Sequence, residues 1–320
     1  MSSSRVANLS RGWLIGPGSD ARPDPFLVAR HGLVTFAVIL VVSGISTASL
    51  SSPLVTSAAC VLLLVVGLPH GALDIAAIRR LAPAAQLPVV CTYLAAAVAM
   101  LAVWWISPLA GLAIFYVVSI AHFADDWCEA SQPFFAYAMA LALLAAPTVL
   151  HSQPLKALFV ALTGDERAIF LVDILTLTAP VASAIALVGL SSMKGVRQQA
   201  ETICALMAMV ILPPLAGFAV FFCLFHSPRH FREGWAALGP NVQRSTTLRI
   251  AAMTVGGFGF AAIIYAAIER PSVPASLFVT SMMTLSALTV PHMLLAALLS
   301  RHARILVDQS ATASNCAPII

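Results

Sequence analysis

The chain has 320 residues, of which 60% are hydrophobic and only 9% are charged. An ordinary soluble domain carries about 25% charged residues, so this composition excludes a soluble globular fold. The net charge of +4 is small, and its Lys and Arg residues lie between the apolar runs. We therefore expect them to set membrane orientation, and we expect no nucleic-acid partner.

Apolar runs of about 20 residues recur along the chain, and each is long enough to cross a bilayer as a helix. Backbone groups in lipid must be satisfied within their own segment, which favours helices. We predict an all-α, polytopic transmembrane bundle that forms one domain over 31–304, between a cytoplasmic tail (1–30) and a disordered tail (305–320). The candidate spans are 33–50, 54–78, 87–106, 109–124, 134–150, 169–190, 203–225, 250–268 and 275–299.

The positive charges test how many of these runs cross. Simple alternation leaves 9 Lys and Arg residues inside against 8 outside. An even number of crossings between Asp126 and His226, for example with the short run 155–162 as a fourth, gives 13 inside against 4 outside. The positive-inside rule therefore favours an even total, most simply eight spans with one apolar segment that does not cross fully.

Five of the eight histidines lie at or inside the apolar runs, where ionisable groups are costly and by default functional. We interpret the other three, His31, His151 and His302, as solvated interface residues. The five candidates are His70, His122, His226, His230 and His292.

The first two motifs share the spacing His-x-x-x-Asp. In Gly67-Leu68-Pro69-His70-Gly71, followed by Asp74, the proline kinks the helix and the glycines permit close approach. A carboxylate four residues after a histidine shares its helix face and can orient an imidazole. His122 and Asp126 repeat the spacing. Without a metal, the first motif would be a local pair that stabilises a kink, and the second an interfacial cluster.

The third motif, 225–230, carries two histidines four residues apart, His226 and His230, which can bind one ion from one helix face. Ser227 and Pro228 also fit an N-cap and a first helical residue, so a kinked helix and a new helix both remain open. The fourth motif places Pro291 before His292 inside a span, where a structural hydrogen bond is as reasonable as metal binding. An even number of crossings brings all these motifs to the cytoplasmic side.

Together these motifs resemble the Brp/Blh family, the bacterial and archaeal membrane β-carotene 15,15′-dioxygenases that supply retinal to rhodopsins. The resemblance covers about residues 60 to 300. It implies a non-haem Fe²⁺ held by His70, His122, His226 and His230, with dioxygen as co-substrate. It also implies catalytic roles nearby for His292, Asp74 and Asp126. Ala124 stands where the family usually has glycine.

The resemblance further implies a multi-pass protein of a prokaryotic plasma membrane with a cytoplasmic N-terminus. An apolar carotenoid would enter from the membrane lipid and be cleaved at its central double bond, and the retinal would be handed to a rhodopsin. The candidate aromatic lining is Trp104, Trp105, Phe115, Tyr116, Phe221, Phe222 and Phe225.

Other functions remain open from the residues alone. A transporter could use intramembrane His and Asp residues as a pathway, and a related His-ligated oxygenase could act on another lipid. The ligand set would also suit zinc or copper. A bis-histidine haem protein would leave the pair His226 and His230 unexplained. The His-x-x-His-His boxes of di-iron desaturases are absent.

Overall fold

The computed structural model describes residues 52–74, 76, 78, 86–128, 132–193, 195–238 and 244–315, without the side chains at 70, 237 and 299–315. Every element in these ranges is helical, which confirms the all-α class. The predicted N-terminal tail (1–30) and the candidate span 33–50 lie outside the described residues.

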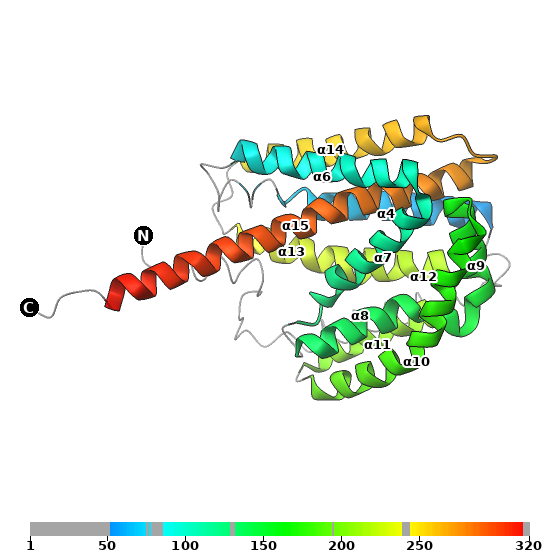
Figure 1. The fold of residues 1–320 in the computed structure, drawn as a ribbon, viewed down its shortest axis with the longest axis horizontal. Coiled ribbons are helices and arrows are strands. Elements are labelled where there is room, and N and C mark those ends of the chain that lie inside the picture. The colour runs from blue at the N-terminus through cyan, green and yellow to red at the C-terminus, as the bar shows by residue number, and fades with distance from the viewer. Residues whose placement is uncertain are drawn as a thin grey trace, which may run out of the picture.

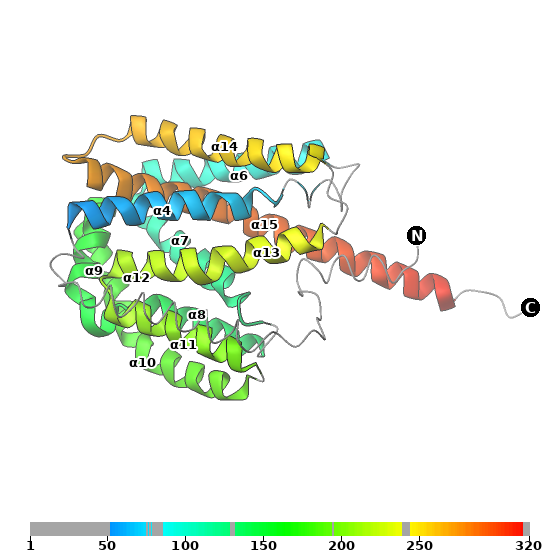
Figure 2. The ribbon, with the colours of Figure 1, turned by 180° about the vertical axis from the view of Figure 1, so that it is seen from behind.

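Most helices run along the long axis of a single bundle (Figures 1 and 2), whereas α9 crosses one end of it. We call this the α9 end, and the opposite end, where α7 and α13 finish, the α13 end. The elements are α4 (Pro53–Gly71), α6 (Gln86–Ile106), α7 (Pro108–Ala124), α8 (Pro133–Ala145), α9 (Thr148–Thr163), η2 (Glu166–Ala168), α10 (Ile169–Ser192), α11 (Val196–Ile211), α12 (Pro214–Phe221), η3 (Phe222–His226), α13 (Ser227–Ala237), α14 (Arg244–Ala267) and α15 (Val273–Asn315).

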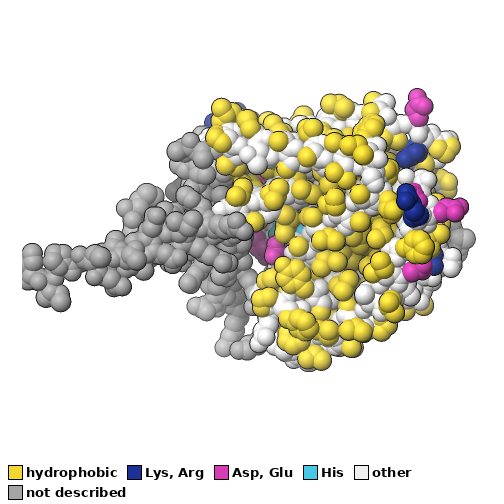
Figure 3. Space-filling model, in the orientation of Figure 1, with side chains coloured by type: hydrophobic (Ala, Val, Ile, Leu, Met, Phe, Trp, Pro, Cys, Tyr) yellow, Lys and Arg dark blue, Asp and Glu magenta, His cyan; other side chains and the backbone are white. Residues whose placement is uncertain are grey.

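The bundle has the character of a membrane protein. Within the part of the chain that the structure describes, four helical segments are long and apolar enough to cross a bilayer: Gln86–Ile106, Glu166–Ser192, Arg244–Ala267 and Val273–Leu298. The pair α8 and α9 passes the same test together but is bent by 67°. Apolar side chains cover the face in Figure 3, and charged ones gather at the α9 end. The total of eight crossings stays a prediction.

The predicted span 203–225 is wrong, because the structure divides it into two helices. α11 ends at Ile211 and α12 begins at Pro214. Pro213 and Pro214 have no N–H to donate, so α11 cannot continue through them. α11 runs toward the α9 end, and α12 with α13 returns (Figure 2). The passes between Asp126 and His226 are therefore α8, α10, α11 and α12 with α13. The extra run along the bundle comes from this break and not from 155–162. Of these runs, only α10, and α8 together with α9, have the length and apolarity of a membrane span among the described residues.

The region of α9 also corrects two expectations. The predicted span 134–150 ends early, at Ala145, and 155–162 lies inside α9. His151 sits at a kink in α9, and its Nε2 lies 3.0 Å from the carbonyl oxygen of Ile211. It is thus a half-buried contact between helices rather than a solvated loop residue.

At the other terminus, α15 continues to Asn315, through the first part of the segment expected to be a disordered tail.

Candidate metal centre

The helix that carries the third motif contains a π turn. α12 passes into α13 through η3, where the N–H of Ser227 donates to the carbonyl oxygen of Phe222, five residues earlier. Pro228 has no N–H, and its ring would clash with the carbonyl four residues before it, so the wider turn accommodates the proline. Of the two geometries left open by the sequence, the structure has one continuous helix, with His226 at the end of η3 and His230 on α13.

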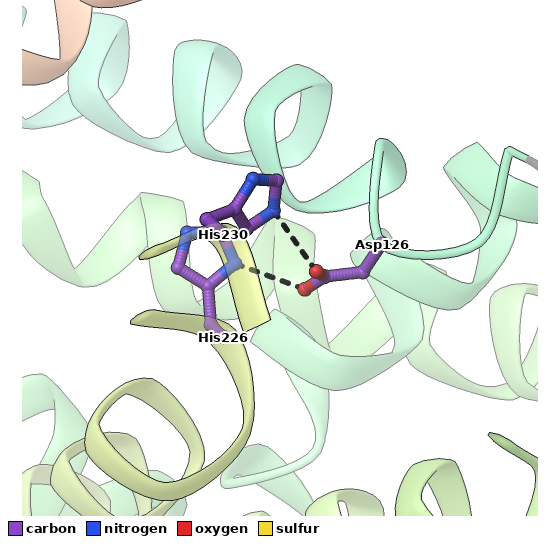
Figure 4. A group of neighbouring side chains, drawn as sticks. All are labelled: Asp126, His226 and His230. Atoms are coloured by element: carbon purple, nitrogen blue, oxygen red, sulfur yellow. Dashed lines mark hydrogen bonds and ion pairs between the residues drawn. The ribbon is translucent and has the colours of Figure 1, made fainter. Parts of the chain in front are cut away.

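Asp126 joins the two histidines of this helix (Figure 4). It lies in the turn after α7, and its Oδ2 is 2.9 Å from His226 Nδ1 while its Oδ1 is 3.1 Å from His230 Nε2. Asp126 and His226 are buried. Burial alone would raise the pKa of Asp126, but the contacts with His226 and then His230 hold this pKa well below its usual value. The three residues offer ligand atoms within 4.8 Å of one another.

His122, at the end of α7, adds a third imidazole. Its Nε2 lies 2.9 Å from His226 Nε2, on the ring edge opposite the one that bonds to Asp126. Two nitrogens bound to one ion at about 2.1 Å are about 3.0 Å apart in octahedral geometry and about 3.4 Å apart in tetrahedral geometry. Because the two nitrogens already face each other at nearly this separation, the donor set fits a shared ion.

His292 and Asp74 form a second pair against this cluster. Nδ1 of His292 lies 2.9 Å from both carboxylate oxygens of Asp74. The hydroxyl group of Tyr93 also interacts with this carboxylate. The ring centroid of His292 is 5.2 Å from that of His122. The second pair therefore borders the same centre from α15 and the residues just after α4.

The structure brings together His122, His226, His230, His292, Asp74 and Asp126. His70 lies in the last turn of α4, but its side chain is outside the described part of the chain. The backbone of α4 comes close to the centre, because a Cβ on Gly67 would lie 2.7 Å from the ring of Phe222. Close approach at this glycine agrees with the sequence prediction, whereas a Cβ on Gly71 would meet nothing within 4 Å.

A charged layer outside Asp126 was not predicted from the sequence. Arg229 Nη1 donates to the backbone oxygen of Asp126 at 3.1 Å and lies 3.5 Å from its carboxylate, while Nη2 pairs with Glu201 at 2.7 Å. Glu201 also pairs with Arg197 at 2.8 Å, and Gln198 donates to the Asp126 backbone oxygen at 2.9 Å. Only the spacing of Arg197 and Glu201, four residues apart on a helix, signalled this network.

Aromatic rings lead away from the centre toward the α9 end. Phe222 stacks on His226 with centroids 5.4 Å apart, and Phe218 stacks on Phe222 at 5.6 Å. Phe115 and Tyr116 line an apolar pocket next to this stack. Trp105, in contrast, is 58% exposed on the outer face, so its predicted place in the lining is wrong. Trp104 is buried and donates to Ser286 at 2.6 Å, which is a packing role.

Comparison with known proteins agrees with the motifs. The model of the family "BCD: Beta-carotene 15,15'-dioxygenase" matches residues 61–300. A curated "Beta-carotene 15,15'-dioxygenase" from uncultured marine bacterium 66A03 is 30% identical over 260 residues, which is 74% of this chain and 91% of the relative. No solved structure matches. With four histidines and two carboxylates gathered at one end of a helical bundle, the chain belongs to the beta-carotene 15,15′-dioxygenase family of carotenoid-cleaving enzymes.

Proposed function

We propose that this protein cleaves the central double bond of β-carotene with dioxygen to give two molecules of retinal, at a ferrous centre held by His122, His226, His230 and His70. The observation that carries the proposal is the convergence of His122 and His226, 2.9 Å apart, on a cluster that Asp126 closes. Ferrous iron at this site would supply the activation of dioxygen, for which neutral imidazole ligands and open positions are suited.

The carboxylates set the direction of the imidazoles. His226 donates from Nδ1 to Asp126, so its Nε2 carries the lone pair toward His122. Asp74 fixes the ring of His292 in the same manner. Cleavage breaks one carbon–carbon double bond and one dioxygen bond, and each carbon gains one oxygen atom. The four electrons that reduce dioxygen come from the double bond, so no external reductant is required.

We place the α13 end on the cytoplasmic side of a prokaryotic plasma membrane, with the N-terminus on the same side. Among the described residues, positively charged ones on α11, α13 and the start of α14 lie at this end, as the positive-inside rule asks. The carotenoid would enter from the lipid between the helices, and retinal would pass to a rhodopsin. The described residues that support this orientation are Arg197, Arg229, Arg232, Arg244 and Arg249.

The transporter alternative has weaker support in the described part of the chain. A pathway across the membrane needs polar groups at several depths. The histidines and acids of the centre instead gather at the α13 end, and the described space that continues toward the α9 end is lined almost entirely by apolar side chains. The other alternative, an oxygenase that acts on another lipid, would use the same metal centre. It differs from the proposed function only in the substrate.

The test is expression in cells that make β-carotene, with iron supplied and retinal measured by chromatography. We expect retinal from the intact protein and none from His70→Ala or His230→Ala, while His302→Ala serves as the histidine control. Carotene left intact by well-expressed protein would refute the dioxygenase proposal. Retinal formation that survives both substitutions would refute the proposed set of metal ligands but would not contradict β-carotene as the substrate.

A further inference from the structure

An apolar pocket lies between the metal centre and the α9 end. Its cavity volume is about 70 Å³, and it is partly open rather than sealed. Its walls come from α7, α8, α9, α11, α12 and α15. Leu112, Phe159 and Met209 are almost fully buried, so the walls belong to the packed interior of the bundle. A pocket this apolar and this deep would suit a hydrocarbon ligand.

The pocket is aligned with the centre along α7. Its lining residues on this helix run from Leu112 to Ser119, that is, from ten to three residues before His122. At 1.5 Å of rise per residue, they cover from about 15 Å to about 5 Å from the ligand position. Phe218 of α12 lies in the wall and begins the ring stack that leads to His226. The pocket therefore starts beside the centre and extends away from it.

The far wall of the pocket is α9, which crosses the end of the bundle (Figures 1 and 2). Leu155, Leu158, Phe159 and Leu162 of this helix all line the pocket. Leu155, Phe159 and Leu162 are each at most 4% exposed. The bend of 67° between α8 and α9 turns this row of side chains across the bundle axis. A bulky, buried wall thus stands opposite the metal centre.

One polar atom faces this apolar space at the end next to the centre. Ser119 lines the pocket and is 3% exposed, and its hydroxyl oxygen makes no hydrogen bond among the described residues. Burying a hydroxyl group without a partner costs free energy, so a ligand group that bonds to it is favoured. The hydroxyl lies where the end of a polyene nearest the metal would lie.

We propose that this pocket holds one half of the carotenoid, with the ring against the α9 wall, and that the wall determines which double bond lies at the metal. The proposal rests on the proposed function. The cavity of about 70 Å³ is smaller than this half of the substrate, so the apolar side chains of the walls move apart as the ring and polyene arm enter. The other half of the substrate lies on the opposite side of the centre. After cleavage, the Ser119 hydroxyl donates a hydrogen bond to the aldehyde oxygen of the retinal that remains in the pocket.

The wall is tested with Phe159→Ala, which lets the ring advance further. The bond at the metal then moves toward the other ring, so the products become two unequal carbonyl compounds, one longer and one shorter than retinal. A methyl-bearing carbon at the cleaved bond gives a ketone instead of an aldehyde. Leu150→Ala is the control, because Leu150 is on the same helix but 62% exposed on the outer face. It should give retinal alone. Leu155→Ala repeats the test at a second wall position if Phe159→Ala does not accumulate.

Wall variants that still make retinal as the sole product would overturn the proposal. A second experiment uses a carotenoid that has one ring and a shortened chain. If the wall fixes the distance from the ring to the cleaved bond, this substrate must still release retinal. Release of an aldehyde that carries the ring but is shorter than retinal would also contradict the proposal that the wall stops the ring.

The Ser119 contact is tested without turnover. Metal-stripped protein in detergent should bind retinal, and Ser119→Ala should weaken this binding by about three- to tenfold, as loss of one hydrogen bond predicts. Unchanged affinity would remove Ser119 from the proposal, and no binding by the intact protein would overturn the pocket. These results do not depend on catalysis. Failure of the intact enzyme to make retinal, with binding preserved, would count against the proposed function only.

Discussion

The two histidine–carboxylate groups of this protein differ in how their carboxylates are held. Asp126 contacts two histidines, and its backbone oxygen also accepts hydrogen bonds from Arg229 and Gln198. Asp74 contacts one histidine, His292, through both of its oxygens. Asp126 is therefore held by four side chains, from α11 and from the continuous helix of η3 and α13, whereas Asp74 is held by two, His292 and Tyr93.

This difference indicates a division of roles around one centre. A carboxylate that orients two imidazoles and is itself fixed is typical of the support for metal ligands. A single imidazole–carboxylate pair beside those ligands can adjust its ring position and proton. We therefore expect the Asp126 group to control metal binding and the Asp74 group to control turnover of a loaded enzyme.

The largest effect is expected from His226→Ala. This change removes an imidazole that contacts both Asp126 and His122, so we expect loss of bound iron and at least a 100-fold loss of retinal formation. Iron content by elemental analysis and product by chromatography measure the two effects. Full iron occupancy in this variant would exclude His226 as a ligand.

The next effect is expected from Asp126→Asn. An amide cannot accept hydrogen bonds from two histidines with both of its terminal atoms, so we expect a 10- to 100-fold loss of iron affinity. Competition with a chelator measures it. Asp173→Asn is the matched control, because this carboxylate is half exposed, pairs with Lys156 and should change the affinity little. Equal losses in both variants would contradict the role of Asp126.

Asp74→Asn tests whether the Asp74 group controls turnover rather than metal binding. The imidazole of His292 keeps its place but loses a charged partner, so we expect kcat to fall by about 10-fold while iron content stays at the level of the unchanged protein. A loss of iron as large as that of Asp126→Asn would mean that the two groups have the same role.

The smallest effect is expected from Arg229→Lys. Lysine keeps the charge but cannot contact Asp126 and Glu201 with one planar fork, so we expect a few-fold loss of iron affinity. Arg229→Gln removes the charge and should cost more. If both variants bind iron as tightly as the unchanged protein, the charged layer has no part in holding Asp126.

The sequence was sufficient for the helical class, for most helix positions and for the residues that gather at the α13 end, because hydropathy and ionisable residues in apolar runs are strong signals. The break at Pro213 was hidden because apolar residues continue on both sides of it. The π turn was hidden because Pro228 also fits an ordinary helix start. The spacing of His122 and Asp126 selected Asp126 over Asp125, but it did not reveal that Asp126 contacts His226 and His230 of another helix, because such contacts depend on packing.

The π turn has a geometric consequence for the helix as a whole. Twelve residues of uniform α-helix would place His230 about 120° around the axis from Phe218. Five of those residues turn more slowly in η3, by roughly 80° each, which reduces the angle to about 20°. Phe218, Phe222, His226 and His230 therefore form one nearly straight row of rings. The pocket wall and the proposed metal ligands therefore lie on the same face of one continuous helix. Deletion of one residue from η3 would rotate the ligands away from that face.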